Sequence, residues 1–93
     1  MVVGVCSIDL RISANDSLKG KRSVVRKIKE RVRNTFNVSV AEVENLDKLQ
    51  RIGLGIAFVS NESSHVHSTL SKVVNFIDHL YVAELIDYHI EVW

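Results

Sequence analysis

Eight of the twelve lysines and arginines in this 93-residue chain fall between positions 19 and 33. Five of them follow a 3-4-3-4 spacing, which places them along one narrow stripe of an α-helix at 100° per residue. The five are Lys19, Arg22, Arg26, Lys29 and Arg33. Ammonium and guanidinium groups bind phosphates and carboxylates through charge-assisted hydrogen bonds. The stripe is therefore the candidate site for RNA phosphates or for an acidic protein.

A solvated helix face is the alternative interpretation of this basic stripe, because charge runs on helices usually serve only solubility. Two features favour binding. No acid interrupts the stripe, and Glu30, the only acid in the segment, lies beside it within reach of Arg26 or Arg33. The formal net charge is only +1, so any affinity for nucleic acid must come from local clustering of charge.

Three of the four histidines and the single cysteine offer no further chemistry. His65 and His67 point about 160° apart on a predicted helix, and His79 lies about 21 Å along it from His65. Neither pair can bind one metal ion. Cys6 falls on the apolar side of a predicted strand, where it acts as a small core residue and not as a nucleophile.

His89 is the best remaining candidate for acid-base chemistry. Asp9, Asp87 and Glu91 are its expected neighbours, and a carboxylate could orient its imidazole ring. Most surface histidines are solvated and have no such role. The chain also lacks a glycine-rich phosphate loop, a nucleophile elbow and a zinc signature. We therefore predict no enzyme activity, no metal, no cofactor and no small-molecule substrate.

Size and composition limit the chain to one globular domain over residues 1–93. Hydrophobic residues make up 46% of the chain and charged residues 25%, as in ordinary soluble proteins. One cysteine cannot form an intramolecular disulfide, which fits a reducing compartment. Neither a secretory leader nor an apolar run near 18 residues is present. We expect a cytoplasmic protein that does not engage a membrane.

Alternation of apolar and polar residues predicts four strands. They cover residues 2–12, 38–44, 51–60 and 85–93. The strand 38–44 has two comparably apolar faces, so we expect it at a sheet edge with a bulge. The strand 51–60 alternates regularly and is expected in the centre of the sheet. In the last strand, Ile86 falls on the same face as Ile90 and Val92.

Helical spacing predicts two helices between these strands. The first follows the polar stretch 13–17, where a serine or aspartate supplies the N-cap, and it runs to about Phe36. The second begins at Ser60 or Asn61 and ends near Tyr81. The resulting order, βαββαβ, predicts an α+β, ferredoxin-like fold with two helices on one face of a four-stranded antiparallel sheet. Right-handed crossovers favour the strand order 4-1-3-2.

The other face of this sheet is expected to stay open. Val3, Val5, Val59 and Trp93 should meet on it and form an apolar patch of the kind that marks a partner surface. We predict self-association, with a homodimer as its simplest form. The alternative is that Trp93, as the terminal residue, only folds over the edge of the sheet.

Two glycines and a lack of aromatics also mark this open face. Gly53 and Gly55 would let a ligand or another backbone approach, or they mark a bulged strand. No aromatic residue occupies the open-face positions of the two central strands, so bases cannot stack there as they do in RNA recognition motifs. RNA would instead be bound through the phosphates, by the basic stripe.

Four segments resemble the YlxP-like family of small bacterial proteins of unknown function. They are MVVGVCSIDL at 1–10, SLKGKR at 17–22, FNVSVAEV at 36–43 and QRIGLGIAFVSN at 50–61. The resemblance covers nearly the whole chain and implies a ferredoxin-like domain. It also implies a neighbourhood of ribosomes and RNA, because the genes of this family often lie among those of translation and ribosome maturation factors.

The chain departs from that family at two positions. Gly20 stands where an acid is usual, so Ser17 lacks the partner for a capping box and the helix start should be weaker by about 1 kcal/mol. Leu49 stands where an aromatic is common. The leading hypothesis is a non-enzymatic domain that binds RNA or a ribosomal subunit through the stripe. The second is a protein-interaction module that uses the open sheet face.

Overall fold

The computed structural model describes all 93 residues and confirms the predicted order of elements. The strands are β1 (Val2–Arg11), β2 (Ser39–Glu44), β3 (Arg51–Ser60) and β4 (Glu84–Val92). The helices are α1 (Leu18–Thr35) and α2 (Ser63–Asp78). Neither helix combines the length and the apolar character that crossing a membrane requires.

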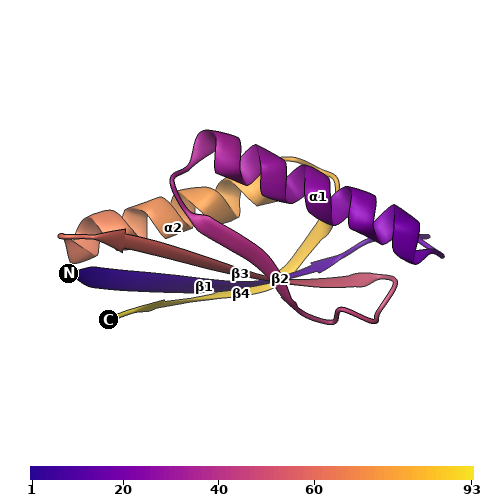
Figure 1. Cartoon of the computed structure of the whole chain (residues 1–93), viewed down its shortest axis with the longest axis horizontal. Helices are drawn as coiled ribbons and strands as arrows, with labels where there is room; N and C mark the ends of the chain where they lie inside the picture. The colour runs from indigo at the N-terminus through magenta and orange to yellow at the C-terminus, as the bar shows by residue number, and fades with distance from the viewer.

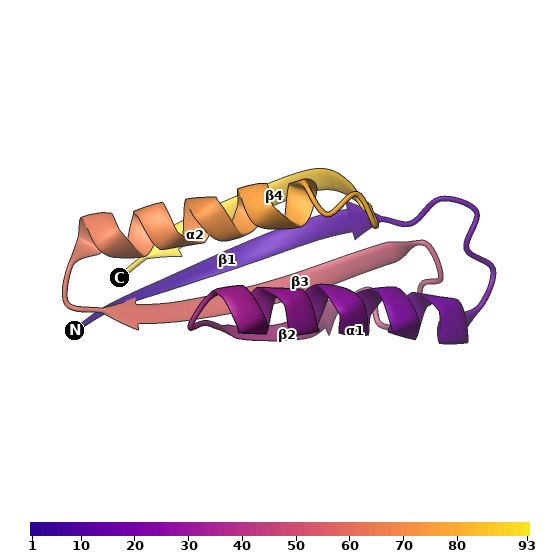
Figure 2. The same cartoon turned by 90° about the horizontal axis from the view of Figure 1, so that it is seen from above.

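The four strands form one antiparallel sheet in the order β2-β3-β1-β4. This is the predicted order 4-1-3-2, counted from the opposite edge, with β3 and β1 in the centre. Both helices lie on one side of the twisted sheet, and the two termini lie near each other at one end (Figure 1). From above, α1 runs over the β2 and β3 side and α2 over the β1 and β4 side (Figure 2).

Sixteen buried hydrophobic residues form the core between the helices and the sheet. The sheet contributes Cys6, Ile8, Leu10, Ile12, Val40, Ile52, Leu54 and Ile56, and the helices contribute Val25, Ile28, Val32, Val66, Leu70, Val73, Val74 and Ile77. Burying one large aliphatic side chain stabilises a fold by about 1.5–3 kcal/mol. The even-numbered residues of β1 and β3 therefore fix the sheet against the helices, while the odd-numbered residues lie on the open face.

The start of α1 agrees with the prediction, whereas both ends of α2 differ from it. Ser17 caps α1, and its hydroxyl accepts a hydrogen bond from the Gly20 amide at 3.0 Å. The N-cap of α2 is Glu62, whose side chain makes no capping bond, and not Ser60 or Asn61. The helix ends at Asp78 and not near Tyr81, which adopts a left-handed backbone conformation (φ 54°) that a right-handed helix cannot include.

Both edge strands carry a bulge. In β2, Glu42 pairs with Leu54 and Glu44 with Gly53, so Val43 is left over, which confirms the bulged edge strand. In β4, Asp87 pairs with Asp9 and Leu85 with Leu10, so Ile86 is skipped. The predicted alternation was therefore wrong at Ile86, which is exposed, while Leu85 packs against the core. One extra residue in a strand exchanges the faces of all residues beyond it.

Cys6 lies in the core as predicted, and burial raises the pKa of its thiol to about 11, against a small opposing effect of a hydrogen bond with the His89 backbone. The unfolded thiol ionises near pH 9, so the folded state loses stability as the pH rises from about 9 to 11. Two pKa units correspond to about 2–3 kcal/mol.

This difference predicts the alkaline stability of the protein. Between pH 8 and pH 11, the free energy of unfolding should fall by about 2–3 kcal/mol more in the native chain than in Cys6→Ala. Urea unfolding at several pH values measures both proteins, and the variant corrects for every pH-dependent contribution other than that of the thiol. Equal losses in the two proteins would contradict the buried, neutral thiol.

Candidate functional site

The five residues of the basic stripe lie along one flank of α1, as the sequence predicted. Arg22, Arg26, Lys19 and Arg33 are exposed, and Lys29 is half-buried. At 1.5 Å per residue, the row is about 21 Å long. The structure thus places the five charges together, on the flank that borders the edge strand β2.

A groove of about 510 Å³ separates this flank of α1 from β2. Its lining comprises Arg22, Val25, Arg26, Lys29, Glu30 and Arg33 from the helix and Ala41, Glu42 and Leu46 from the strand side. Lys19 lies one turn before the groove, near the start of the helix. Four of the five stripe residues therefore project along one concave surface, which an extended chain of phosphates could follow.

No carboxylate neutralises the stripe. The four ion pairs of the structure involve other basic residues or a histidine, and none includes a member of the stripe. Glu30, expected within reach of Arg26 or Arg33, forms an ion pair with neither. The Arg33 guanidinium donates to the Val40 carbonyl at 3.1 Å, which satisfies a donor but leaves its charge uncompensated. The positive charge of the stripe is therefore available to an anion.

Lys21 is a buried charged residue beside the groove that the sequence reasoning missed. Its side chain is 2% exposed, and its ammonium lies 2.9 Å from the Glu42 carboxylate. The same ammonium donates to the Asn45 carbonyl at 2.5 Å. Its position, four residues before the buried Val25, is the one available indication, since it continues the buried side of α1. The pair links α1 to β2 and neutralises Glu42, one of the two acids that line the groove.

The predicted apolar row also comes together on the open face. Val3 pairs with Val59 across β1 and β3, and its amide and carbonyl bond the Trp93 backbone at 2.9 and 2.8 Å. Val59 is 54% exposed and Trp93 67% exposed. Val5, the fourth predicted residue, lies two positions along β1 on the same face. Trp93 continues the β4 ladder, so it is not a loose terminus.

The glycines of β3 accommodate another part of the same chain. A Cβ atom on Gly53 would lie 2.6 Å from the Glu44 Cβ, and one on Gly55 would lie 3.2 Å from both methyl groups of Val43. The strand that carries the glycines is not itself bulged, since β3 pairs with β1 without a register shift. The bulge lies in the neighbouring β2, whose residues Val43 and Glu44 pack closely over the two glycines. They do not mark a ligand site.

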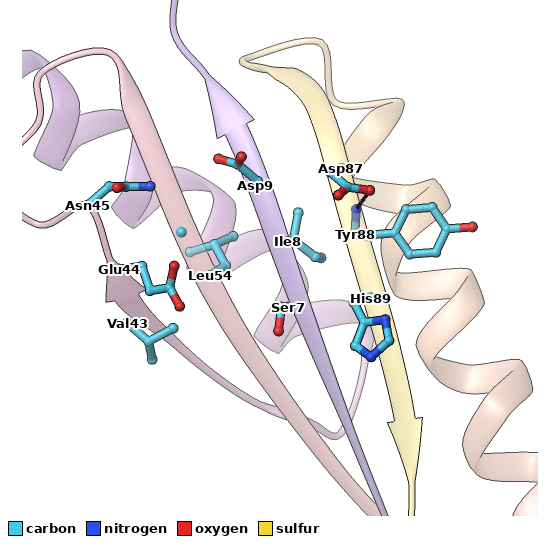
Figure 3. Close-up of a pocket in the computed structure, with 11 residues that line it drawn as sticks. Ser7, Ile8, Asp9, Val43, Glu44, Asn45, Leu54, Asp87, Tyr88 and His89 are labelled. Carbon is cyan, nitrogen blue, oxygen red and sulfur yellow. Dashed lines mark hydrogen bonds between the residues drawn. The ribbon is translucent and has the colours of Figure 1, made fainter.

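A pocket of about 150 Å³ on the open face is lined by His89, Asp9 and Asp87, three of the four residues considered for acid-base chemistry (Figure 3). Glu91 is not among its lining residues. The Nε2 atom of His89 lies 3.1 Å from the Glu91 carboxylate, while the Asp9 carboxylate pairs with Arg51. Asp87 accepts a hydrogen bond from the Tyr88 amide at 2.9 Å. Of the three expected partners, only Glu91 contacts His89. No hydroxyl or thiol is hydrogen-bonded to the imidazole, so a nucleophile is not activated there.

The other histidines make local contacts. His65 packs edge-on against Phe58 with ring centroids 5.5 Å apart, and the Nδ1 atom of His79 lies 2.7 Å from the Asn75 carbonyl. No group of three or more His, Cys, Asp or Glu side chains is placed to hold a metal ion. The basic stripe and the apolar row therefore remain as the two candidate binding surfaces.

Comparisons with known proteins agree with the resemblance stated from the sequence. Residues 3–90 match the family described as "Protein of unknown function (DUF503)". The "Uncharacterized protein YlxP" of Bacillus subtilis (strain 168) is 39% identical over 77 residues, which span 83% of this chain and 84% of that protein.

A solved structure from Deinococcus radiodurans, whose name suggests an antibiotic biosynthesis monooxygenase, is 21% identical with a TM-score of 0.47. The similarity covers 100% of this chain and 90% of that one. On the match over residues 3–90 and the identity to YlxP, this chain belongs to the DUF503 family of proteins of unknown function.

Proposed function

We propose that this protein is a non-enzymatic, cytoplasmic domain that binds the phosphate backbone of RNA, on or near a ribosomal subunit, through the basic stripe of α1. The observation that carries the proposal is a row of five basic side chains without a carboxylate partner, four of them along one groove. Leaving five like charges together costs free energy through mutual repulsion. An anionic partner removes that cost.

RNA is favoured over an acidic protein for two reasons. The row is about 21 Å long and regular, which suits the repeated phosphates of a nucleic-acid strand. The resemblance to the YlxP-like family also implies a ribosomal neighbourhood. Binding of this kind does not read sequence, because the contacts are to phosphates and the open sheet face offers no aromatic platform on its central strands.

The salt dependence of RNA binding tests the proposal by counting phosphate contacts. For five contacts, the plot of log K against log [KCl] should have a slope of about −3.5 for a single strand and about −4.5 for a duplex. Fluorescence anisotropy of a labelled 20-nucleotide RNA and of its duplex, between 25 and 200 mM KCl, gives both slopes. A slope between 0 and −1, or no binding at 25 mM, would contradict phosphate binding by the stripe.

The open sheet face is the second candidate surface, for a protein partner. It is favoured by the row of Trp93, Val3 and Val59, since a contiguous exposed apolar row commonly marks an interaction site. The two surfaces lie on opposite layers of the molecule, so one function does not exclude the other (Figure 1).

A further inference from the structure

We propose that the open sheet face binds a second copy of this chain, with Trp93 of each copy seated in a shallow depression of the other. This inference rests on the second candidate function and is independent of RNA binding. Trp93 projects from the last position of the β4 ladder, where its backbone is held by two hydrogen bonds to Val3. A large aromatic side chain in a fixed place is a typical interface anchor.

The depression lies on the same face as Trp93, toward the centre of the sheet. Its volume is about 240 Å³, and its lining is made mostly of small or branched apolar side chains. The residues that shape it are Val5, Ser7, Ala41, Val43, Gly55 and Ala57. The methyl groups of Val43 lie over Gly55 and form one wall of the depression, while the small side chains of Ala41 and Ala57 leave its floor low. An indole ring can lie flat on such a floor.

Trp93 and the depression lie on the same face, so two copies can each bind the other through the same pair of features. A two-fold axis can run parallel to the sheet, midway between Trp93 and the depression. Rotation about this axis places each indole opposite the depression of the other copy, so both contacts form at once. This isologous arrangement closes at two copies. A protein partner of another kind would use only one of the two complementary features.

The size of the face indicates a reversible dimer. Four strands about 4.8 Å apart give a width of about 19 Å, and the ten residues of β1 give a length of about 33 Å. Covering the face would bury roughly 600 Å² per copy and about 1,200 Å² in total, at the lower end of specific interfaces. We therefore expect association in the micromolar range.

Two ion pairs and one histidine–carboxylate contact within each copy lower the cost of covering the face, whereas the carboxylates of Asp87 and Glu44 on it have no cationic partner. Arg11 and Glu84 lie 2.6 Å apart, Arg51 pairs with Asp9, and His89 contacts Glu91. Burying an unpaired charge would oppose association. The stripe of α1 remains on the outer side of each copy, so a dimer would present two stripes to RNA.

Trp93 is the only tryptophan of the chain and reports directly on this contact. Sedimentation velocity and tryptophan emission are measured together, without RNA, from 1 to 500 μM protein. The expected result is a monomer to dimer transition at which the emission moves to shorter wavelength. A monomer throughout, or a dimer with unchanged emission, would overturn the proposal.

Variants separate this contact from other modes of association. Ala57→Glu places a charge on the floor of the depression and should weaken the dimer at least 10-fold. Val43→Glu changes the exposed wall of the depression and gives the same test if Ala57→Glu does not fold. Tyr81→Ala removes an aromatic that is 81% exposed outside the sheet, and it should dimerise like the native chain. Native dimerisation by both folded glutamate variants would overturn the proposal.

Discussion

Reversing four charges of the stripe should lower the affinity for RNA by about 100-fold or more at 50 mM salt, because each lost phosphate contact removes its share of counterion release. The variant carries Lys19→Glu, Arg22→Glu, Arg26→Glu and Lys29→Glu. Arg33 is retained since its guanidinium donates to the Val40 carbonyl and links α1 to β2. Anisotropy titrations with the labelled single strand measure the loss, and circular dichroism checks the fold.

A matched control separates the stripe from net charge. Its four reversals lie outside the stripe, at Lys27, Arg31, Lys48 and Lys72. Both variants change the formal net charge from +1 to −7, since each reversal removes two units. The control should lose affinity by less than about 10-fold, through the general field alone. Equal losses in both variants would show that the stripe is not a site.

Replacing Lys21 by methionine should lower the free energy of unfolding by about 3–5 kcal/mol, a large share of the stability of a domain this small. The change leaves the Glu42 carboxylate, 18% exposed, without its cation and removes the donor to the Asn45 carbonyl. Urea unfolding at pH 7, monitored by far-ultraviolet circular dichroism, measures the loss.

Two further variants serve as controls for this measurement. Lys27→Met, an exposed position of the same helix, should change the free energy of unfolding by less than about 0.5 kcal/mol. The double variant Lys21→Met with Glu42→Leu should recover most of the stability, because an apolar pair replaces a buried ion pair at little cost. If Lys21→Met were as stable as Lys27→Met, the buried pair would have no structural role.

The fold was predictable because apolar residues repeat every second position in the strands and at helical spacing in the helices. The alternation in β1 and β3 assigned the core face and the open face correctly along ten residues each. The stripe of α1 followed from helical spacing alone. The row of Val3, Val59 and Trp93 followed from the strand directions, which the crossover rule fixes.

Features that depend on exact register or on partners distant in sequence were not predictable. Ile86 was assigned to the wrong face because a bulge leaves no unambiguous mark in the sequence. Asp9 was expected beside His89, but its carboxylate pairs with Arg51 on the neighbouring strand. Lys21 was not singled out, since its partner Glu42 lies 21 positions away and only the packing of α1 on β2 brings them together.

The start of α1 also depends on a contact with residues distant in sequence, which could not be predicted. Gly20 suggested a weakened helix start, yet the Asn15 side chain donates to the Ser17 carbonyl at 2.9 Å and to the Leu49 carbonyl at 2.6 Å. A Cβ atom on residue 20 would lie 2.4 Å from the Asn15 amide oxygen. A tertiary contact with the loop after β2 thus occupies the space that a side chain at this position would need.

Co-sedimentation with ribosomal subunits tests the central claim most directly. The native protein and the two charge-reversed variants are centrifuged with purified subunits at 50 and 150 mM KCl. We predict that the native protein and the control sediment with subunits at 50 mM, that this fraction falls steeply at 150 mM, and that the stripe variant stays in the supernatant at both salts. Sedimentation of the stripe variant with subunits to the same extent as the native protein would contradict RNA binding through α1.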